Sequence, residues 1–284
     1  MSVDVEDYFH VEAFSGIVDR SQWDSYSCRV QENTRFILDL LSEFDVRGTF
    51  FVLGWVAERF PGLVREIAAR GHELACHSYW HRLIYQLTPE EFREDTLRAK
   101  DIIEQASGTA IFGYRAPSYS ITRRSLWALD ILAEVGFAYD SSIFPIHHDI
   151  YGIPDSPRKP YRVETQAGSL LECPITTFRW RERNMPVGGG GYLRIFPWWY
   201  TRFGIRSTQR EGVPLIVYFH PWEVDPEQPR LPGRLKSRLR HYTNLRHMET
   251  RLRRLLQLMP FTSFRDSEIG ATAVDSVVIP GAAA

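Results

Sequence analysis

The chain has 284 residues, enough for one large α/β domain or two small ones with a substantial core. Hydrophobic residues make up 44% of it and charged residues 24%, which is typical of a soluble globular protein. The formal net charge is −1, so overall charge indicates neither a nucleic-acid partner nor a membrane surface.

The three cysteines, Cys28, Cys76 and Cys173, are too few and too widely spaced for a disulfide framework, and they form no Cys-x-x-Cys motif. They favour a reducing compartment over secretion. We find no signal peptide and no apolar run long enough to span a bilayer, so we expect a cytoplasmic bacterial protein without a membrane span. Strand-like residues follow Met1 at once, and we expect a few natural residues before it.

Residues 2–9 alternate as in a strand and then gather three carboxylates, Asp4, Glu6 and Asp7. Aspartate is unfavourable in strands, so acids at a strand's end need a reason. One interpretation is a helix N-cap or a solvated turn. The other is a functional site.

Helices and strands then alternate along the chain. Asn33 and Thr34 can cap a helix, residues 48–54 form an apolar run typical of a buried parallel strand, and Pro61 opens a helix that Gly71 ends. Further elements are predicted in the order helix 88–106, strand 112–119, helix 123–135 and strand 137–142. Such alternation with short connections predicts a parallel sheet or barrel.

Two histidines, His77 and His81, follow a predicted strand directly. If one helical turn separates them, their imidazoles point the same way, and two neutral imidazoles can bind one divalent metal. Histidines at this spacing also occur in ordinary solvated turns, so the rest of the chain must decide.

The second half is less regular. Residues 145–168 are rich in proline and polar residues, which we interpret as an irregular excursion within one domain, and a strand returns at 169–174. The four glycines at 188–191 lack the pattern of a phosphate-binding loop, so a flexible or close-packed loop near a ligand is the better interpretation. Residues 214–222 predict a buried strand that ends on His220.

Residues 230–254 are basic, with Glu249 the only acid, and include a helix with an apolar stripe. We favour the solvated side of an amphipathic helix over a contact with an anionic polymer. Residues from about 270 to 284 have no helical or strand period, and we expect a disordered tail.

Polar residues thus end several strands, and in one barrel they would converge on a single mouth. Two histidines and one carboxylate leave open positions on a metal, as catalysis requires. A second carboxylate can act as a base, a separate histidine can protonate a leaving nitrogen, and an arginine and an aspartate can orient them. This set predicts metal-assisted amide hydrolysis.

The order of these pieces across residues 2–225 resembles the polysaccharide deacetylases, carbohydrate esterase family four. The matching motifs are Asp4-Val-Glu6-Asp7, His77-Ser-Tyr-Trp-His81, Arg115-Ala-Pro117, Asp140-Ser-Ser and Phe-His220-Pro. The resemblance implies an α/β fold, a distorted incomplete (β/α) barrel of about seven strands, and hydrolysis of N-acetyl groups on an amino sugar. Asp-Val-Glu-Asp-Tyr-Phe, the glycines and residues 220–223 and 241–244 resemble a bacterial subgroup. That subgroup is encoded with exopolysaccharide and exosortase systems, and it carries its own C-terminal extension.

The resemblance also implies residue roles. Asp4 would be the base, oriented by Arg115, and His220 the acid, oriented by Asp140. Relatives have two adjacent aspartates in the first motif, whereas Val5 separates Asp4 from Glu6 here.

Strand alternation puts Asp4 and Glu6 on one face, so we choose Glu6 as the metal ligand beside His77 and His81, with Asp7 as the alternative. The expected substrate-binding residues are Trp80, Pro117, Tyr119, Gly189, Gly190, Tyr192 and Trp222.

We therefore expect a metal-dependent N-deacetylase, with Zn²⁺ as the first choice of ion. Its partner would be an acetylated amino-sugar polysaccharide or oligosaccharide, namely a bacterial exopolysaccharide or its precursor, and not a nucleic acid. We place the catalytic barrel at 1–225, including an irregular part at 145–200, a basic helical extension at 226–269 and the tail at 270–284. The alternatives are a hydrolase of small cyclic amides, imides or ureides and an inactive polysaccharide-binding module, and the oligomeric state stays open.

Overall fold

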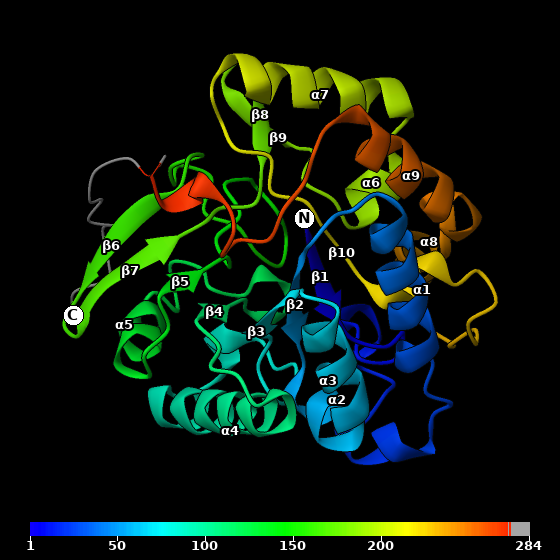
Figure 1. Ribbon diagram of the computed structural model, residues 1–284, viewed down its shortest axis with the longest axis vertical. Helices are drawn as coiled ribbons and strands as arrows, with labels where there is room; N and C mark the ends of the chain where they lie inside the picture. The colour runs from blue at the N-terminus through cyan, green and yellow to red at the C-terminus, as the bar shows by residue number, and fades with distance from the viewer. Residues whose placement is uncertain (272, 274–284) are drawn as a thin grey trace.

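An open sheet of eight strands forms the centre of the computed structural model, which describes residues 1–271 and 273 (Figure 1). The order across the sheet is β10-β1-β2-β3-β4-β5-β7-β6. The strands are β1 (Ser2–Val5), β2 (Thr49–Val52), β3 (Glu73–Cys76), β4 (Gly113–Tyr114), β5 (Tyr139–Asp140), β6 (Tyr161–Thr165), β7 (Gly168–Glu172) and β10 (Tyr218–Phe219). Seven of them pair in parallel, and β6 adds an antiparallel edge. This confirms the incomplete barrel, with one strand more than expected.

Helices surround this sheet (Figure 1). They are α1 (Val30–Glu43), α2 (Gly54–Arg59), α3 (Pro61–Ala69), α4 (Pro89–Ser107), α5 (Trp127–Glu134), α6 (Gly191–Ile195), α7 (Trp198–Arg210), α8 (Leu235–Tyr242) and α9 (Met248–Leu258). Short 3₁₀ helices lie at Glu12–Phe14, Arg20–Ser25, Ile84–Gln86, Pro117–Tyr119, Pro221–Val224, Leu245–His247 and Glu268–Gly270. A separate hairpin consists of β8 (Thr177–Trp180) and β9 (Arg183–Pro186). Among the described residues, no helix is both long and apolar enough to cross a membrane.

The central strands are buried at every position of β1, β2 and β3, which is why their sequences read as continuous apolar runs. In register, Asp4 lies beside Phe51, Phe51 beside Ala75 and Cys76 beside Tyr114. These strands therefore end at similar levels, and the residues that follow them share one edge of the sheet.

Two predicted helices begin and end where their sequences indicate. Pro61 opens α3, and Thr88 caps α4 through a reciprocal pair of hydrogen bonds with Glu91, while Gly108 ends α4 with a left-handed φ of 71°. The helix expected to begin at Asn33 begins at Val30 instead. Its first N–H groups are satisfied from outside the helix, by the carboxylate of Asp7, which is distant in sequence.

Two other expectations need correction. The strand expected at 214–222 is confined to Tyr218–Phe219, and the excursion at 145–168 contains the edge strand β6. Of the two expectations for the glycine segment, the close-packed loop is the one present: Gly189 has a φ of 128°, and a Cβ there would lie 1.9 Å from the Tyr218 carbonyl oxygen.

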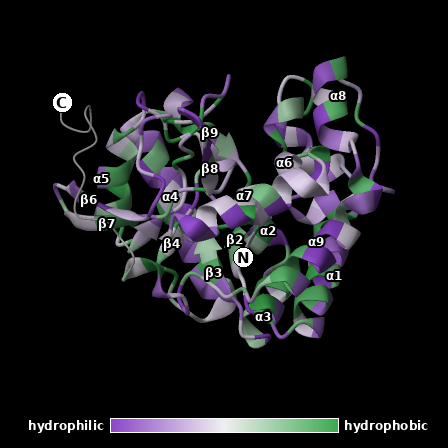
Figure 2. Cartoon of the chain, turned by 90° about the horizontal axis from the view of Figure 1, so that it is seen from above, coloured by the Kyte–Doolittle hydropathy of each residue, from purple (hydrophilic) through white to green (hydrophobic). Residues whose placement is uncertain are grey.

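The basic C-terminal extension packs through one face of α9. Met248, Leu252, Leu255 and Leu256 are buried, which confirms the predicted apolar stripe. Hydrophilic and hydrophobic residues alternate along α9, and α8 lies at the margin of the molecule (Figure 2). Of the expected disordered tail, residues 272 and 274–284 lie outside the described part of the chain.

Candidate active site

Five ionisable side chains meet at the carboxyl edge of the sheet. Asp4 and Glu6 come from the end of β1, His77 and His81 follow β3, and His220 follows β10. All five line one cleft of about 560 Å³. The predicted convergence of strand ends on a single mouth is thus present for these five residues, whereas Asp7, Arg115 and Asp140 do not line the cleft.

A candidate metal centre lies at the bottom of this cleft. Glu6, His77 and His81 are buried, and each offers a ligand atom within 4.8 Å of the others. Nε2 of His81 lies 2.7 Å from Oε2 of Glu6. Two imidazoles and one carboxylate are a donor set that suits Zn²⁺ or a similar ion and leaves coordination positions open.

The surroundings of these three residues fit a cation. Nδ1–H of His77 donates to the carbonyl oxygen of Arg115 at 2.8 Å, which leaves the Nε2 lone pair free for a metal. Burial lowers the pKa of His77 to about 4, so its imidazole is neutral near pH 7. Among the described residues, buried Glu6 Oε2 has no hydrogen bond of good geometry although His81 Nε2 lies 2.7 Å away, and an ion bound by both atoms would satisfy it.

The segment between the histidines is not the helical turn that we expected. Ser78 and His81 have φ values of 61° and 50°, in the left-handed region. The carboxylate of Asp95 supports the turn by accepting from the backbone N–H groups of Tyr79 and Trp80, at 2.7 and 3.3 Å. A tight left-handed turn, and not a helix, brings the two imidazoles together.

Asp7, the alternative ligand, points away from the histidines. Its Oδ2 accepts from the backbone N–H groups of Arg29 and Val30, at 2.6 and 2.8 Å. Strand alternation therefore predicted that Glu6, and not Asp7, lies beside the histidine pair, as the structure has it. The role of Glu6 as a metal ligand remains a proposal.

This difference between the two acids can be tested. Glu6→Gln should weaken Zn²⁺ binding by about 100-fold or more, because it removes an anionic ligand. Asp7→Asn should keep the metal and lower the free energy of unfolding by about 1 kcal/mol, because it weakens the cap of α1. Calorimetric metal titration and thermal unfolding of both variants measure these effects. Loss of metal from Asp7→Asn, with Glu6→Gln unaffected, would reverse the assignment.

Asp4, the expected base, is held by a buried arginine. Nη1 of Arg115 donates to Asp4 Oδ1 at 2.6 Å and to Ser2 Oγ at 2.9 Å, and Nη2 donates to Ser141 Oγ at 3.0 Å. The second oxygen of Asp4, Oδ2, lies 3.9 Å from Nε2 of His220. The expected pairing of Arg115 with Asp4 is thus present.

The expected pairing of His220 with Asp140 is absent, and Glu223 takes its place. Oε2 of Glu223 lies 3.0 Å from both the backbone nitrogen and Nδ1 of His220. Asp140 is instead fully buried beside Glu172, its partner in the register of β5 and β7, and it accepts from Ser142 Oγ at 2.5 Å. Burial raises the pKa of both Asp140 and Glu172, which favours a shared proton over a free carboxylate.

The sequence carried a signal for Glu223 that we missed. In His220-Pro-Trp-Glu223, proline opens a 3₁₀ turn, so the glutamate at its third position can reach back to residue 220.

The electrostatics around His220 favour its protonated form. Burial by itself opposes a charge on the ring, but the carboxylates of Glu6, Glu223 and Asp4 outweigh it and raise the pKa of His220 to about 9. Burial likewise opposes the charge on Glu6, and His81 and His220 together hold the pKa of Glu6 well below its usual range.

Parts of the chain are similar to known proteins. Residues 22–139 match the family model of polysaccharide deacetylases, and residues 141–268 match a second model, described only as a domain of unknown function (DUF3473). The first half of this chain thus contains a match to the polysaccharide deacetylases. The second match covers the expected C-terminal extension together with the chain from residue 141 onward.

Individual relatives align with this chain over shorter stretches. A Bacillus cereus protein named peptidoglycan-N-acetylglucosamine deacetylase is 35% identical over 100 residues, which are 35% of this chain and 36% of that protein. The chain spans less than half the length of the curated relatives that it matches.

Two solved structures have the same fold. A Mycobacterium smegmatis protein assigned to the polysaccharide deacetylases has a TM-score of 0.56 at 22% identity, covering 94% of this chain and 93% of that one. The PuuE allantoinase has a TM-score of 0.55 at 17% identity, covering 84% and 71%. At these identities the structural matches establish the fold alone.

The cleft has aromatic walls. Tyr119 and Tyr192 line it as expected, and so do His148 and Tyr151, which belong to the irregular excursion and which we missed. The hydroxyl groups of Tyr151 and Tyr192 lie 2.9 Å apart. Nothing in the local sequence of residues 148–151 indicated a position at the cleft, because only the fold brings that loop there.

Five other predicted substrate-binding residues do not line the cleft. Trp222 is buried, and its indole N–H donates to Glu6 Oε1 at 3.1 Å, so it orients an expected metal ligand and does not stack on a sugar. Gly189 and Gly190 pack on Tyr218, and the neighbouring Gly191 lines the cleft in their place. Trp80 packs on Tyr79 and Trp23, and buried Pro117 opens a 3₁₀ turn.

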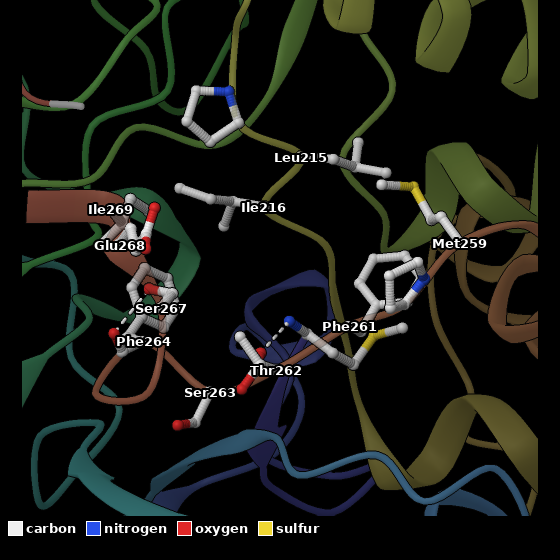
Figure 3. Close-up of a pocket in the computed structure, with 13 residues that line it drawn as sticks. Leu215, Ile216, Met259, Phe261, Thr262, Ser263, Phe264, Ser267, Glu268 and Ile269 are labelled. Carbon is white, nitrogen blue, oxygen red and sulfur yellow. Dashed lines mark hydrogen bonds between the residues drawn. The ribbon is translucent and has the colours of Figure 1, made fainter. Parts of the chain in front are cut away.

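A second pocket lies at the opposite, amino end of β1 and β10. It has about 280 Å³ and is lined mainly by apolar side chains such as Leu215, Ile216, Phe261 and Phe264 (Figure 3). Its ionisable groups are Glu268 and the amino terminus. Of the residues that the structure describes, no histidine, cysteine or aspartate lines it, so the cleft with its histidines and carboxylates is the better candidate for an active site.

Proposed function

We propose that this protein is a metal-dependent N-deacetylase acting on an amino sugar of a bacterial exopolysaccharide or its precursor. One observation carries the proposal: buried Glu6, His77 and His81 form a metal-ligand set in a cleft that also holds Asp4 and His220. A base and an acid beside a Lewis-acid site are what amide hydrolysis needs.

Glu6, His77 and His81 would hold a divalent ion, for which we propose Zn²⁺, and that ion would polarise the acetyl carbonyl and lower the pKa of a water molecule. Asp4 accepts a proton from the water that attacks the carbonyl carbon. His220 gives a proton to the sugar nitrogen as the C–N bond breaks, which leaves acetate and a free amine.

The contacts of Asp4 and His220 support these roles. Arg115 occupies only Oδ1 of Asp4, while Oδ2 lies on the side of His220, 3.9 Å from its Nε2. Glu223 occupies Nδ1 of His220, so Nε2 is the nitrogen left to donate into the cleft. The base and the acid thus each keep one atom free for the substrate.

Three observations support an acetylated amino sugar as the substrate. The cleft volume of about 560 Å³ lies within the range of small-molecule sites. Tyr151 and Tyr192 line the cleft with aromatic faces and hydroxyl groups that suit a sugar ring, and Tyr119 adds aromatic surface. The Bacillus cereus relative is named for N-acetylglucosamine in a polymer, and the subgroup motifs favour an exopolysaccharide. We propose that residues 1–225 and the helical extension 226–269 act as one catalytic unit.

Acetate release tests the substrate class. The Zn²⁺-supplemented protein should deacetylate N-acetylglucosamine oligomers and not allantoin. Turnover of allantoin alone would favour the cyclic-amide alternative. Saturable binding of the oligomers without any turnover would favour the binding module.

The role of His220 can be tested by changing the leaving group. His220→Ala should slow release of acetate from an N-acetyl sugar by about 10²–10⁴-fold, because an amine leaves poorly without a proton. Hydrolysis of 4-nitrophenyl acetate should fall far less, since its leaving group needs none. Equal losses on both substrates would show that His220 is not the acid.

A further inference from the structure

A buried arginine connects the proposed acid to the C-terminal extension. Arg194, on α6, has a fully buried guanidinium whose Nε donates to Oε1 of Glu223 at 2.5 Å. Its Nη1 donates to the carbonyl oxygens of His241 and Thr243 at 3.1 and 2.6 Å, and its Nη2 donates to that of Arg240 at 3.2 Å. One side chain therefore binds both Glu223 and the carboxyl end of α8.

This arrangement uses the geometry of an arginine in particular. Backbone carbonyls at the end of a helix carry partial negative charge and attract a cation. The planar guanidinium can satisfy them and a carboxylate at the same time, whereas a lysine ammonium has no such fork. Because a buried ion pair costs much desolvation, its presence needs a reason beyond packing.

The reason lies in the position of the Glu223 carboxylate. Arg194 occupies Oε1, and Oε2 accepts from the backbone nitrogen and Nδ1 of His220, both at 3.0 Å. Burial opposes the charge on Glu223, but Arg194 and His220 hold the pKa of Glu223 at about 2. With both oxygens engaged, the carboxylate cannot turn away from His220.

The extension contacts the site by a second route. The His241 ring stacks on Trp222 at 4.1 Å, and Trp222 stacks on His220 at 5.1 Å while donating to Glu6. Residues of α8 and the segment after it thus lie directly behind both the proposed acid and a proposed metal ligand.

We propose that Arg194 is a positioning residue for the general acid, and that the extension takes part in catalysis by anchoring Arg194. The proposal rests on the deacetylase function. Arg194 holds Glu223 against Nδ1 of His220, which fixes the ring with Nε2 towards the scissile amide. Asp140, expected from family resemblance to do this, accepts from Ser142 instead, and Glu223 is the partner of Nδ1.

Arg194→Met and a matched control, Arg251→Met, test the proposal. Arg251 also joins α6 to the extension, through the carbonyl oxygens of Leu193 and Phe196 at 2.5 Å each, but Glu223 is not among its partners. Arg194→Met should lower kcat on an N-acetylglucosamine oligomer by about 10–100-fold with little change in KM. The loss is smaller than that expected for removal of the general acid itself, because His220 remains in the site. Hydrolysis of 4-nitrophenyl acetate should fall much less. Arg251→Met should change both rates alike and only slightly.

Two further variants separate positioning from stability. Arg194→Lys keeps a cation beside Glu223 and should restore part of kcat. In a Glu223→Gln background, Arg194→Met should lower kcat little further, since both substitutions remove the same contact. This double variant also removes the uncompensated buried charge if Arg194→Met alone folds poorly. Additive losses, or equal losses on the amide and the ester, would overturn the proposal.

A readout without turnover distinguishes this proposal from the proposed function. The ¹⁵N and ¹H resonances of His220 Nδ1–H should shift in Arg194→Met and in Glu223→Gln, and stay unchanged in Arg251→Met. An unchanged resonance in Arg194→Met would overturn the positioning role. A shifted resonance in a protein inactive on all acetylated sugars would support that role and overturn the deacetylase function.

Discussion

A His77→Ala/His81→Ala double variant should bind no Zn²⁺ and should lose deacetylation by about four powers of ten or more. Both imidazoles belong to the buried cluster with Glu6, and a single remaining carboxylate cannot hold the ion in place. The fold should survive, because the sheet is built from other residues. Metal content by mass spectrometry, acetate release and circular dichroism measure the three effects.

A matched control for this variant is His72→Ala. His72 is also a buried histidine, but it precedes β3, and its Nδ1 accepts from the backbone N–H of Gly48. Its loss should lower stability and leave metal content and kcat near the wild-type values. Full activity of the double variant would refute the metal-dependent mechanism.

Asp4→Asn should lower kcat by about 10²–10⁴-fold with metal still bound. Asparagine can still accept the hydrogen bond from Arg115, but it cannot accept the proton of the attacking water. Metal titration together with the rate of acetate release separates a loss of metal binding from a loss of the proton acceptor.

Ser2→Ala is the corresponding control for Asp4. It removes the other acceptor of Arg115 Nη1, at 2.9 Å, and leaves the carboxylate in place. We expect a loss of less than about tenfold, since the proton acceptor remains. If Asp4→Asn lost its metal, or if both variants lost equal activity, Asp4 would be a ligand or a structural group and not the base.

Much of the architecture could be predicted, because it depends on local chemistry. Apolar runs predicted β2 and β3. Thr88 together with Glu91 predicted where α4 begins, and Gly108 predicted where it ends. Parallel strands end at one edge, so polar residues after them could be brought together without knowledge of the fold. That reasoning placed Asp4, Glu6 and the histidine pair correctly.

The remaining errors concern contacts that depend on tertiary register. Asp140 pairs with Glu172 because β5 lies beside β7, and sequence alone does not show which strands are neighbours. The start of α1 is shifted because a distant carboxylate, that of Asp7, caps it. Trp222 was expected on the sugar, but residues of the extension cover it and turn its N–H towards Glu6.

The roles of the C-terminal extension were the least predictable part. Its basic run indicated a solvated helix surface, and α9 agrees with that interpretation. The functional contact comes from α6, where Arg194 reaches the carbonyl groups of α8 and the carboxylate of Glu223. No sequence period indicates such a contact, because its partners are separated by 29 and 46 residues.

The most direct test of the deacetylase assignment is acetate release from an N-acetylglucosamine oligomer by the purified protein after chelation and after stepwise return of Zn²⁺. We expect almost no acetate from the chelated protein and recovery in proportion to the ion bound, up to one per chain. Equal acetate release with and without metal, or none with one Zn²⁺ bound per chain, would contradict the proposed metal-dependent deacetylation.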